Sequence, residues 1–259
     1  MGIFFKPEPV NDPANRMLTQ LKYSSMKQGI DKRFRAPRIW SNQELKKIAP
    51  LCQGNIINVS AWQDEDKEGS IYKNYFPKAH SYVISNYKTE ARGFQGVENE
   101  FFLDLTADLP GELVQKFDVV FNHTTLEHIF NVDKAFYNLC TLSKDLVIII
   151  VPFMQEMHGD YGDYWRFTPL CLQKLFEKNS MSMIYCNFNS QPNTSVYIFA
   201  VGSKNPSEWA GKFPGLNKKG LGTPLQQEVA GYNVVTNTRS FSSLISSVSK
   251  RFSKAKTKS

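Results

Sequence analysis

The chain has 259 residues, of which 41% are hydrophobic, so it can bury one sizeable core. Roughly 200 residues make one α/β domain, which leaves extensions at both ends. No stretch reaches the roughly 18 consecutive apolar residues that a membrane span needs, and residues 1–9 lack the apolar core of a signal peptide. We therefore expect a cytoplasmic protein made of one domain with appendages.

The formal net charge of +7 comes mainly from the C-terminal end. Residues 203–259 contain ten Lys or Arg against two Glu, so the rest of the chain is nearly neutral. This distribution disfavours a nucleic-acid partner and favours contact of the tail with an anionic membrane surface. Apolar residues on one helical face predict a weak amphipathic helix in the tail; a tail without stable structure is the alternative. These residues are Phe241, Leu244, Ile245, Val248 and Phe252.

The cysteines and histidines form no pattern typical of a metal site. The cysteines are Cys52, Cys140, Cys171 and Cys186. They are scattered singly without a C-x-x-C pair, which indicates reduced, mostly packed thiols rather than disulfides or zinc ligands. The spacing of His123 and His128 puts them on different faces, and no third ligand stands at a metal-site interval. We therefore expect no bound metal.

The first elements of the chain predict a helix followed by a buried strand. Residues 41–44, Ser-Asn-Gln-Glu, form a capping-box pattern, and apolar residues follow at helical spacing. A helix should therefore begin at Ser41 and end near Pro50, leaning on a strand at Asn55–Val59. After a polar run, Gly69–Phe76 predicts a short helix.

The middle of the chain predicts strands that lie side by side. Ser81–Ser85 and Phe101–Leu103 are short strand candidates. Phe117–Asn122 and Leu146–Val151 predict longer, buried strands, and Val132–Leu142 between them carries apolar residues at helical spacing. A strand, a crossover helix and a second strand in this order make a parallel pair. We expect this pair at the centre of an open α/β sheet.

The C-terminal part of the domain predicts one helix and a hairpin. Thr168-Pro169 should open a helix that runs to about Lys178. Met183–Phe188 and Val196–Val201 predict two strands, which must be antiparallel because their connection is too short to cross over. The sheet then has seven strands, and ligands of such sheets bind outside the carboxyl ends of the strands. The predicted organisation is an N-terminal helical extension (1–53), an α/β domain (54–202) and an extended segment with a basic tail (203–259).

Short motifs stand at the predicted strand ends of this domain. They are Phe117-Asp118-Val119-Val120, Leu126-Glu127-His128, Val151-Pro152-Phe153 and the run His158–Pro169 with Asp163-Tyr164-Trp165-Arg166. Over about residues 55–201 the chain resembles class I S-adenosylmethionine-dependent methyltransferases, and more closely the type-11 branch linked to bacterial cell-surface sugar biosynthesis. The resemblance implies a Rossmann-like, seven-stranded, mostly parallel sheet with a C-terminal antiparallel hairpin. It also implies S-adenosyl-L-methionine as the cofactor.

The resemblance places the cofactor along the ends of the first four strands. The implied contacts are Asn58, Ser60, Gly69, Tyr72, Asn86, Asp104, Leu105, Asn122 and His123. Two places depart from the family pattern. The first loop has Asn58 in place of the usual acid and Trp62 in place of the usual glycines, and Asn86 replaces the acid that usually binds ribose. Asparagine can still accept one hydrogen bond and donate another. As structural alternatives, Asp104 can cap a turn and Asn58 can hydrogen-bond its own loop.

The loop after the fifth strand carries the candidate catalytic residues. A histidine, with a pKa of about 6.5, can take a proton from an acceptor hydroxyl near neutral pH. We therefore assign His158 as the base, with Asp163 beside it. Tyr164, Arg166 and Glu127 are assigned to the substrate, Arg166 because its donors suit an anionic group. In the alternative interpretation His158 and Asp163 hold the loop together, and Glu127 belongs to a helix start.

The leading interpretation is an enzyme that methylates a hydroxyl or similar group of a sugar or surface-polysaccharide precursor. The saccharide acceptor follows from the resemblance alone. The alternative is a catalytically degenerate binding or scaffold protein on the same fold, docked to a membrane by its basic tail. In either case we expect a cytoplasmic protein whose tail attaches it peripherally to the inner face of the membrane.

Overall fold

The computed structural model describes residues 35–88, 93–158, 162–191, 194–213 and 230–231. The predicted basic tail and its amphipathic helix lie outside these residues. All four cysteines are free, and three of them are buried, as predicted. Among the described helices, none combines the length and the hydropathy that crossing a bilayer would require.

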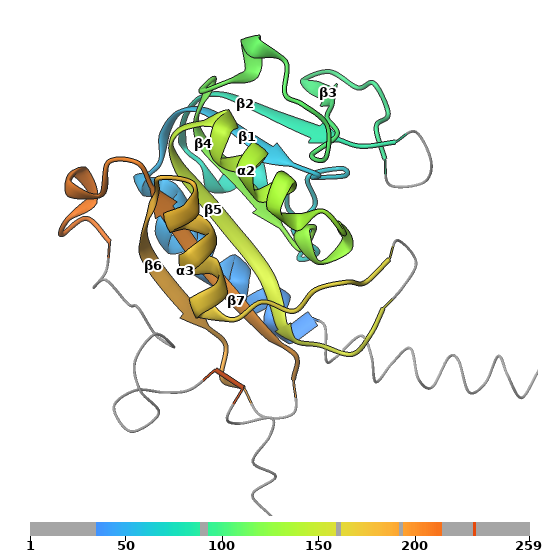
Figure 1. The fold of residues 1–259 in the computed structure, drawn as a ribbon, viewed down its shortest axis with the longest axis vertical. Coiled ribbons are helices and arrows are strands. Elements are labelled where there is room, and N and C mark those ends of the chain that lie inside the picture. Colours follow the sequence, from blue (N-terminus) through green and yellow to red (C-terminus); the bar gives the residue numbers. More distant parts are fainter. Residues whose placement is uncertain (1–34, 89–92, 159–161, 192–193, 214–229, 232–259) are drawn as a thin grey trace, which may run out of the picture.

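A seven-stranded sheet forms the centre of the fold, in the order β3-β2-β1-β4-β5-β7-β6 (Figure 1). Its strands are β1 Gln53–Val59, β2 Lys78–Asn86, β3 Glu100–Phe102, β4 Phe117–His123, β5 Ser143–Met154, β6 Ser182–Phe188 and β7 Val196–Ser203. The first five strands pair in parallel, whereas β7 runs antiparallel to both β5 and β6. This confirms the predicted Rossmann-like α/β sheet with an antiparallel C-terminal hairpin.

The order of the strands reverses between β1 and β4. The strands β2 and β3 extend the sheet on one side of β1, whereas β4 and β5 extend it on the other. The two strands pair in parallel from Ile56 opposite Val119 to Val59 opposite Asn122. In open α/β sheets such a reversal leaves a crevice outside the carboxyl ends of the strands. The loops that follow β1 and β4 meet at this crevice.

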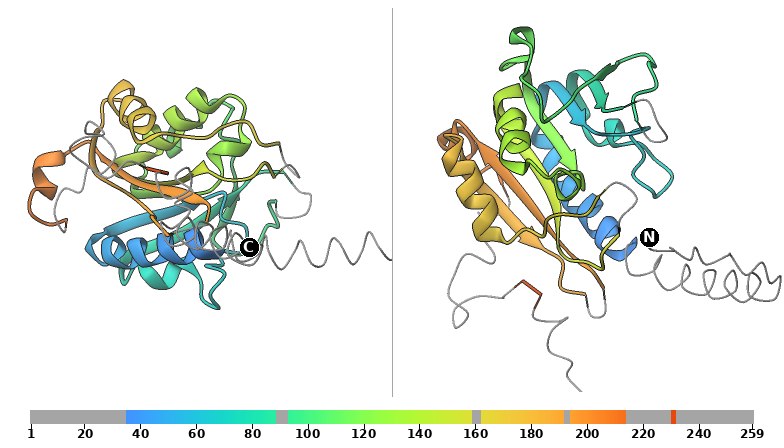
Figure 2. Two further views of the ribbon diagram at one scale, coloured as in Figure 1. Left: turned by 90° about the horizontal axis from the view of Figure 1, so that it is seen from below. Right: turned by 45° about the vertical axis from the view of Figure 1, so that its right-hand side comes forward.

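Helices cover both faces of the sheet (Figure 2). α2 Val132–Leu142 and α3 Pro169–Lys178 lie on one face, and the helical residues 35–48 lie on the other. Neighbouring strand residues such as Ile56 and Ile57 belong to opposite cores, because strand side chains alternate between the faces. Short 3-10 turns complete the fold: η1 Ala49–Leu51, η2 Tyr72–Tyr75, η3 Gly111–Leu113, η4 Leu126–His128 and η5 Pro206–Trp209.

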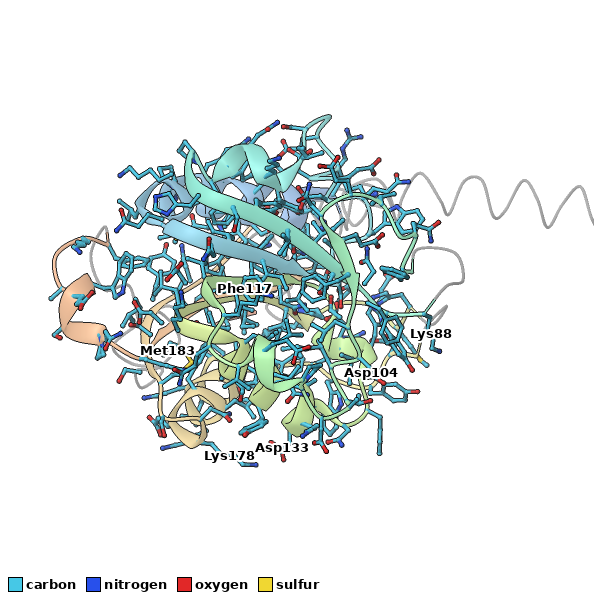
Figure 3. All side chains as sticks on the ribbon, turned by 90° about the horizontal axis from the view of Figure 1, so that it is seen from above. Lys88, Asp104, Phe117, Asp133, Lys178 and Met183 are labelled. Atoms are coloured by element: carbon cyan, nitrogen blue, oxygen red, sulfur yellow. The ribbon has the colours of Figure 1, made fainter. Side chains whose placement is uncertain are left out.

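The helices α2 and α3 begin and end where the sequence predicts. The hydroxyl of Thr168 accepts a hydrogen bond from the backbone N–H of Cys171, which caps α3. Lys178 Nζ lies 3.0 Å from Asp133 Oδ1 and so connects the end of α3 with the start of α2 (Figure 3). Both side chains are exposed, so this ion pair contributes little to stability.

The predicted start of the N-terminal helix at Ser41 is wrong, because the chain is already helical at residue 35. Ser41 lies inside the helix, where its Oγ donates to the carbonyl of Arg38 and hydrogen-bonds Nε2 of His123. Glu44 accepts hydrogen bonds from Tyr185 and Asn187 of β6. Ser41 and Glu44 of the capping-box pattern therefore make tertiary contacts on a buried helix face.

The predicted helix Gly69–Phe76 is reduced to the turn η2. Asp66 Oδ1 accepts the backbone N–H groups of Glu68 and Ser70, and Asp64 Oδ2 accepts that of Lys73. Side-chain acceptors that capture backbone N–H groups in this way compete with a helix. The helix is shorter than predicted because these carboxylates, which precede the segment, bind the backbone N–H groups at its start.

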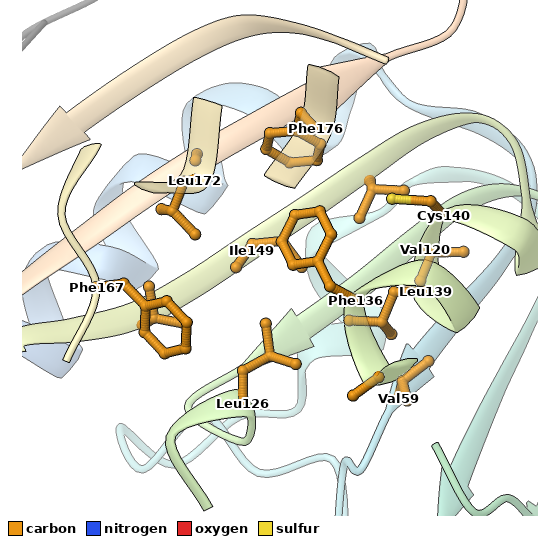
Figure 4. Packing of buried hydrophobic residues seen from close by; sticks show 14 of the residues in the cluster. Val59, Val120, Leu126, Phe136, Leu139, Cys140, Ile149, Phe167, Leu172 and Phe176 are labelled. Carbon is orange, nitrogen blue, oxygen red and sulfur yellow. The ribbon is translucent and has the colours of Figure 1, made fainter. Parts of the chain in front are cut away.

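Replacing Gly202 of β7 with Val should destabilise the protein by about 1–3 kcal/mol through overpacking. A Cβ at Gly202 would lie 2.3 Å from Cδ1 of Phe176, a fully buried ring of α3 (Figure 4). Urea unfolding followed by circular dichroism measures the change. The matched control is Gly111→Ala, because nothing lies within 4 Å of that Cβ position. Equal unfolding midpoints for the two variants would contradict the packing seen here.

Candidate functional site

An open pocket of about 260 Å³ lies at the carboxyl ends of β1 and β4, where the strand order reverses. Side chains from both loops, η2 and the N-terminal helix form its walls. They are Arg38, Asn58, Ser60, Ala61, Trp62, Glu65, Lys67, Tyr72, His123, Thr124 and Thr125. Four of the predicted cofactor contacts, Asn58, Ser60, Tyr72 and His123, are therefore brought together in one pocket.

Arg38 is a pocket residue that sequence reasoning missed. Its guanidinium donates to the hydroxyl of Tyr72 at 3.2 Å and to Oγ1 of Thr124 at 3.1 Å. Within the described part of the chain it forms no salt bridge, and Glu127 acts on it only through longer-range electrostatics. A partly buried guanidinium without a carboxylate is suited to binding an anionic group of a ligand. A lone arginine ahead of a predicted helix carries no sequence signal for this role.

His123 forms a neutral wall of the pocket. Its Nε2 hydrogen-bonds Ser41 Oγ and its Nδ1 hydrogen-bonds Thr124 Oγ1, both at 3.0 Å. Burial lowers the pKa of His123 well below its usual value, and the charge of Arg38 lowers it further. The imidazole is therefore uncharged at neutral pH and is held on both sides.

The loop after β1 adopts backbone conformations that favour glycine, although other residues stand at these positions. Ser60, Trp62 and Asp64 have φ angles of 60°, 55° and 61°, in the left-handed region. This backbone costs about 1 kcal/mol or more per residue, so other contacts must hold it. Asp64 accepts hydrogen bonds from Asn58 Nδ2 and from the hydroxyl of Tyr82, both at 2.7 Å. Asn58 therefore hydrogen-bonds its own loop, which is the structural alternative to a cofactor contact given in the sequence analysis.

Asn86 joins this loop to the end of β2. Its Oδ1 accepts the backbone N–H of Trp62 at 2.7 Å, and its Nδ2 donates to the carbonyl of Trp62 and to Oε1 of Glu100. Burial tends to raise the pKa of Glu100, but hydrogen bonds from Asn86 and from backbone N–H groups outweigh it and the pKa is lowered. Asn86 thus bridges an ionised carboxylate and a backbone carbonyl, outside the lining of the pocket. We call this arrangement of Trp62, Asn86 and Glu100 the loop clasp.

The other predicted cofactor contacts also lie outside the pocket lining. Gly69 stands in an exposed turn with a φ of 95°. Asp104 Oδ1 accepts from the N–H and the hydroxyl of Thr106, both at 2.7 Å, which is the turn contact named as its alternative. Leu105 is buried, and Asn122 donates to the carbonyl of Val59 at 2.9 Å, connecting β4 with β1.

A second group of polar side chains gathers beside the loops after β4 and β5. Glu127 is fully buried, and neither of its carboxylate oxygens has a hydrogen-bond partner among the described residues. Burial raises the pKa of Glu127 to about 8. His128 Nε2 lies 3.8 Å from Glu127 Oε1, and the rings of His128 and His158 are 4.9 Å apart. The structure therefore brings the predicted His158 together with Glu127 and adds His128, which sequence reasoning had placed in a helix start.

Asp163 and Arg166 hold the loop that carries His158. Arg166 binds both carboxylate oxygens of Asp163, and Asp163 Oδ2 accepts the backbone N–H of His158 at 2.9 Å. The hydrogen bonds from Arg166 lower the pKa of Asp163 to about 2. Arg166 also donates to the carbonyls of Gln155, Glu156 and Trp165. Asp163 thus holds the loop together, as in the alternative interpretation, and the guanidinium of Arg166 is engaged within the loop.

Three aromatic side chains form an exposed platform beside this group. Phe130 is 73% exposed, Tyr164 52% and Trp165 38%. The ring of Phe130 lies 5.4 Å from that of Tyr164 and 6.3 Å from that of Trp165. The backbone N–H of Tyr164 donates to the carbonyl of Glu127 at 2.8 Å, which fixes the platform next to Glu127. Exposed apolar patches of this kind often mark ligand-binding surfaces.

Comparisons with known proteins find similarity to solved structures only. No family model and no curated protein match the chain. The magnesium protoporphyrin IX methyltransferase of Synechocystis, with bound S-adenosylhomocysteine, is 11% identical with a TM-score of 0.44, over 69% of this chain and 87% of the other. The 1,6-didemethyltoxoflavin-N1-methyltransferase of Burkholderia thailandensis is 13% identical with a TM-score of 0.44, over 77% and 93%. The YcgJ protein of Bacillus subtilis is 13% identical with a TM-score of 0.45, over 62% and 97%. These values are too low to place the chain in a family.

Proposed function

We propose that the chain binds S-adenosylmethionine in the pocket at the ends of β1 and β4 and transfers its methyl group to a small polar acceptor. The position of the pocket carries this proposal, since it lies where the strand order reverses and holds the Arg38 guanidinium, which has no paired carboxylate among the described residues. Ligands of open α/β sheets bind at such a reversal. The sequence motifs at the strand ends support the same function.

The residues present fit the amino-acid half of this cofactor. Arg38 would bind its carboxylate, beside Thr124, Tyr72 and Ser60 of the same pocket. For the adenosine half, Asp104 and Leu105 at the end of β3 remain our proposed adenine contacts. Asn86 would contact the ribose after exchanging its hydrogen bonds to Trp62. The loop clasp thus makes ribose binding conditional on a local rearrangement.

When bound, the cofactor supplies an electrophilic methyl group, and the chain's own residues orient the acceptor and manage its proton. We assign the acceptor to the space beside Glu127, His128 and His158. His158 is the proposed proton acceptor, and Asp163 keeps it in place through the hydrogen bond to its backbone N–H. Asp163 and Arg166 position the loop.

We further propose a sugar or surface-polysaccharide precursor as the acceptor. The platform of Phe130, Tyr164 and Trp165 offers exposed ring faces to a ring-shaped ligand beside Glu127. The sequence resemblance supports the same class of acceptor. Action in the cytoplasm, with the basic tail at the inner face of the membrane, belongs to this proposal as well.

Calorimetric titration of the full chain with S-adenosylhomocysteine should give binding in the micromolar range, about −8 kcal/mol. Adenosine is the matched control ligand, because it lacks the carboxylate that Arg38 is proposed to bind. Adenosine should therefore bind more weakly. If neither compound binds at millimolar concentration, the proposal fails, and a binding or scaffold role on the same fold becomes the better explanation.

A further inference from the structure

Glu127, His128 and His158 form a compact donor group. Each offers one ligand atom, and these atoms all lie within 4.8 Å of one another. Metal–ligand bonds of about 2.0–2.2 Å place tetrahedral ligands about 3.3–3.6 Å apart. The separation of 3.8 Å between His128 Nε2 and Glu127 Oε1 is already close to that range. The His158 side chain is 34% exposed, so an ion can reach the group from solvent.

Hydrogen bonds set the proton positions on both rings. His128 Nδ1 faces the carbonyl oxygen of Gly162 at 2.5 Å, and a carbonyl can only accept, so Nδ1 carries the proton and Nε2 the lone pair. His158 Nδ1 likewise faces acceptors, the carbonyl of Glu156 at 3.3 Å and Asp163 Oδ2 at 3.5 Å. Metal-bound histidines typically donate their second N–H to a carbonyl or a carboxylate in this way.

The burial of the Glu127 carboxylate points independently to a bound ligand. It is 0% exposed, and neither carboxylate oxygen has a hydrogen-bond partner among the described residues. The guanidinium groups of Arg38 and Arg166 act on it electrostatically without forming a salt bridge within the described ranges. A buried carboxylate without partners is costly, and a coordinated cation would satisfy it.

We propose that Glu127, His128 and His158 bind one divalent transition-metal ion of the zinc type. Two histidines and one glutamate are a donor set that zinc takes when a further position stays open. That open position suits an oxygen of the acceptor, next to the aromatic platform. From the sequence we expect no metal, because His128 is considered there together with His123. In the fold, His128 lies beside His158 instead. With the ion bound, His158 is a ligand and not the proton acceptor, because a coordinated Nε2 has no lone pair left to take a proton. The proposal goes beyond methyl transfer and does not depend on it.

Titration of the chelator-treated full chain with Zn²⁺ alone tests the site. All proteins carry Cys171→Ser, because Cys171 is an exposed thiol that could bind zinc by itself. We expect one ion per chain by calorimetry and by metal analysis after dialysis. His158→Ala and Glu127→Gln should each weaken binding by at least about 100-fold, more than the 10–100-fold typical of residues that only support a ligand. His80→Ala, an exposed histidine of β2, should leave binding unchanged.

Co²⁺ provides a second readout. Four-coordinate Co²⁺ in the site should give visible absorption bands that His158→Ala and Glu127→Gln abolish and His80→Ala retains. Equal Zn²⁺ affinity in all four proteins, or no stoichiometric binding to the parent, would overturn the proposal. Near-ultraviolet circular dichroism confirms the fold of each variant, and His158 sits in a loop where truncation leaves the core intact. No cofactor is present in these titrations, so their failure is distinguishable from a failure of S-adenosylhomocysteine binding.

Discussion

Replacing Arg38 with Met is expected to weaken the binding of S-adenosylhomocysteine by about 100-fold. Hydrogen bonds to charged groups contribute about 1.5–3 kcal/mol, and loss of about 3 kcal/mol corresponds to this factor. The methionine side chain keeps much of the aliphatic packing of arginine but has no donors for a carboxylate. Calorimetric titration of the variant and of the parent protein measures the difference.

The matched control is Arg35→Met on the same helix. Arg35 is exposed and does not line the pocket, so its replacement removes the same charge without removing a pocket donor. We expect the parent affinity for Arg35→Met. Adenosine should bind the Arg38 variant and the parent equally, because it lacks the carboxylate. Equal losses of S-adenosylhomocysteine binding in both variants would show that Arg38 acts only through overall charge.

Replacing Asn86 with Asp should destabilise the protein by about 3 kcal/mol, although an acid is the residue usually found there in the family that the sequence resembles. The Nδ2 of Asn86 donates to an ionised Glu100 and to the carbonyl of Trp62. A carboxylate in its place would set two negative charges and a carbonyl oxygen against one another. Asn86 is buried, so water can compensate little of this repulsion. Urea unfolding at neutral pH measures the loss.

The double variant N86D/E100Q tests the reason for this loss. Glutamine at position 100 restores a donor opposite the new carboxylate, so most of the lost stability should return. The coupling between the two changes isolates their interaction. Glu100→Gln alone should cost much less than Asn86→Asp, because its amide can still accept from Asn86. If the double variant is as unstable as Asn86→Asp, the loop clasp does not explain the asparagine.

The loop clasp gives a physical reason for both departures from the family pattern, the first loop and Asn86. Ser60, Trp62 and Asp64 adopt left-handed backbone that glycine would adopt at lower cost. The hydrogen bonds of Asn86 to the backbone of Trp62 offset part of that cost. An asparagine at the end of β2 and a loop without glycine therefore belong to one arrangement. Cofactor affinity and loop stability should change together when this arrangement is altered.

The sequence by itself determined the sheet and the helices that pack on one face of it. The strands β4 and β5 and the helices α2 and α3 follow from apolar periodicity and a Thr-Pro helix start, which are local signals. The antiparallel hairpin β6–β7 follows from the length of its connection. The predicted residues Asn58, Ser60 and His123 share a pocket because parallel strands end at the same edge, and Tyr72 joins them from η2.

Only the tertiary structure decided which side chains act together at that edge. Arg38 reaches Thr124 across 86 residues of sequence, and Ser41 and Glu44 turned out to be buried contacts of a helix that begins earlier. Likewise, His158 meets Glu127 and His128 because the loops after β4 and β5 fold against each other. Local sequence patterns cannot predict such contacts, because the packing of segments distant in sequence determines which side chains come together. The same packing buries Glu127 with no hydrogen-bond partner among the described residues, and the proposed metal site is built on that observation.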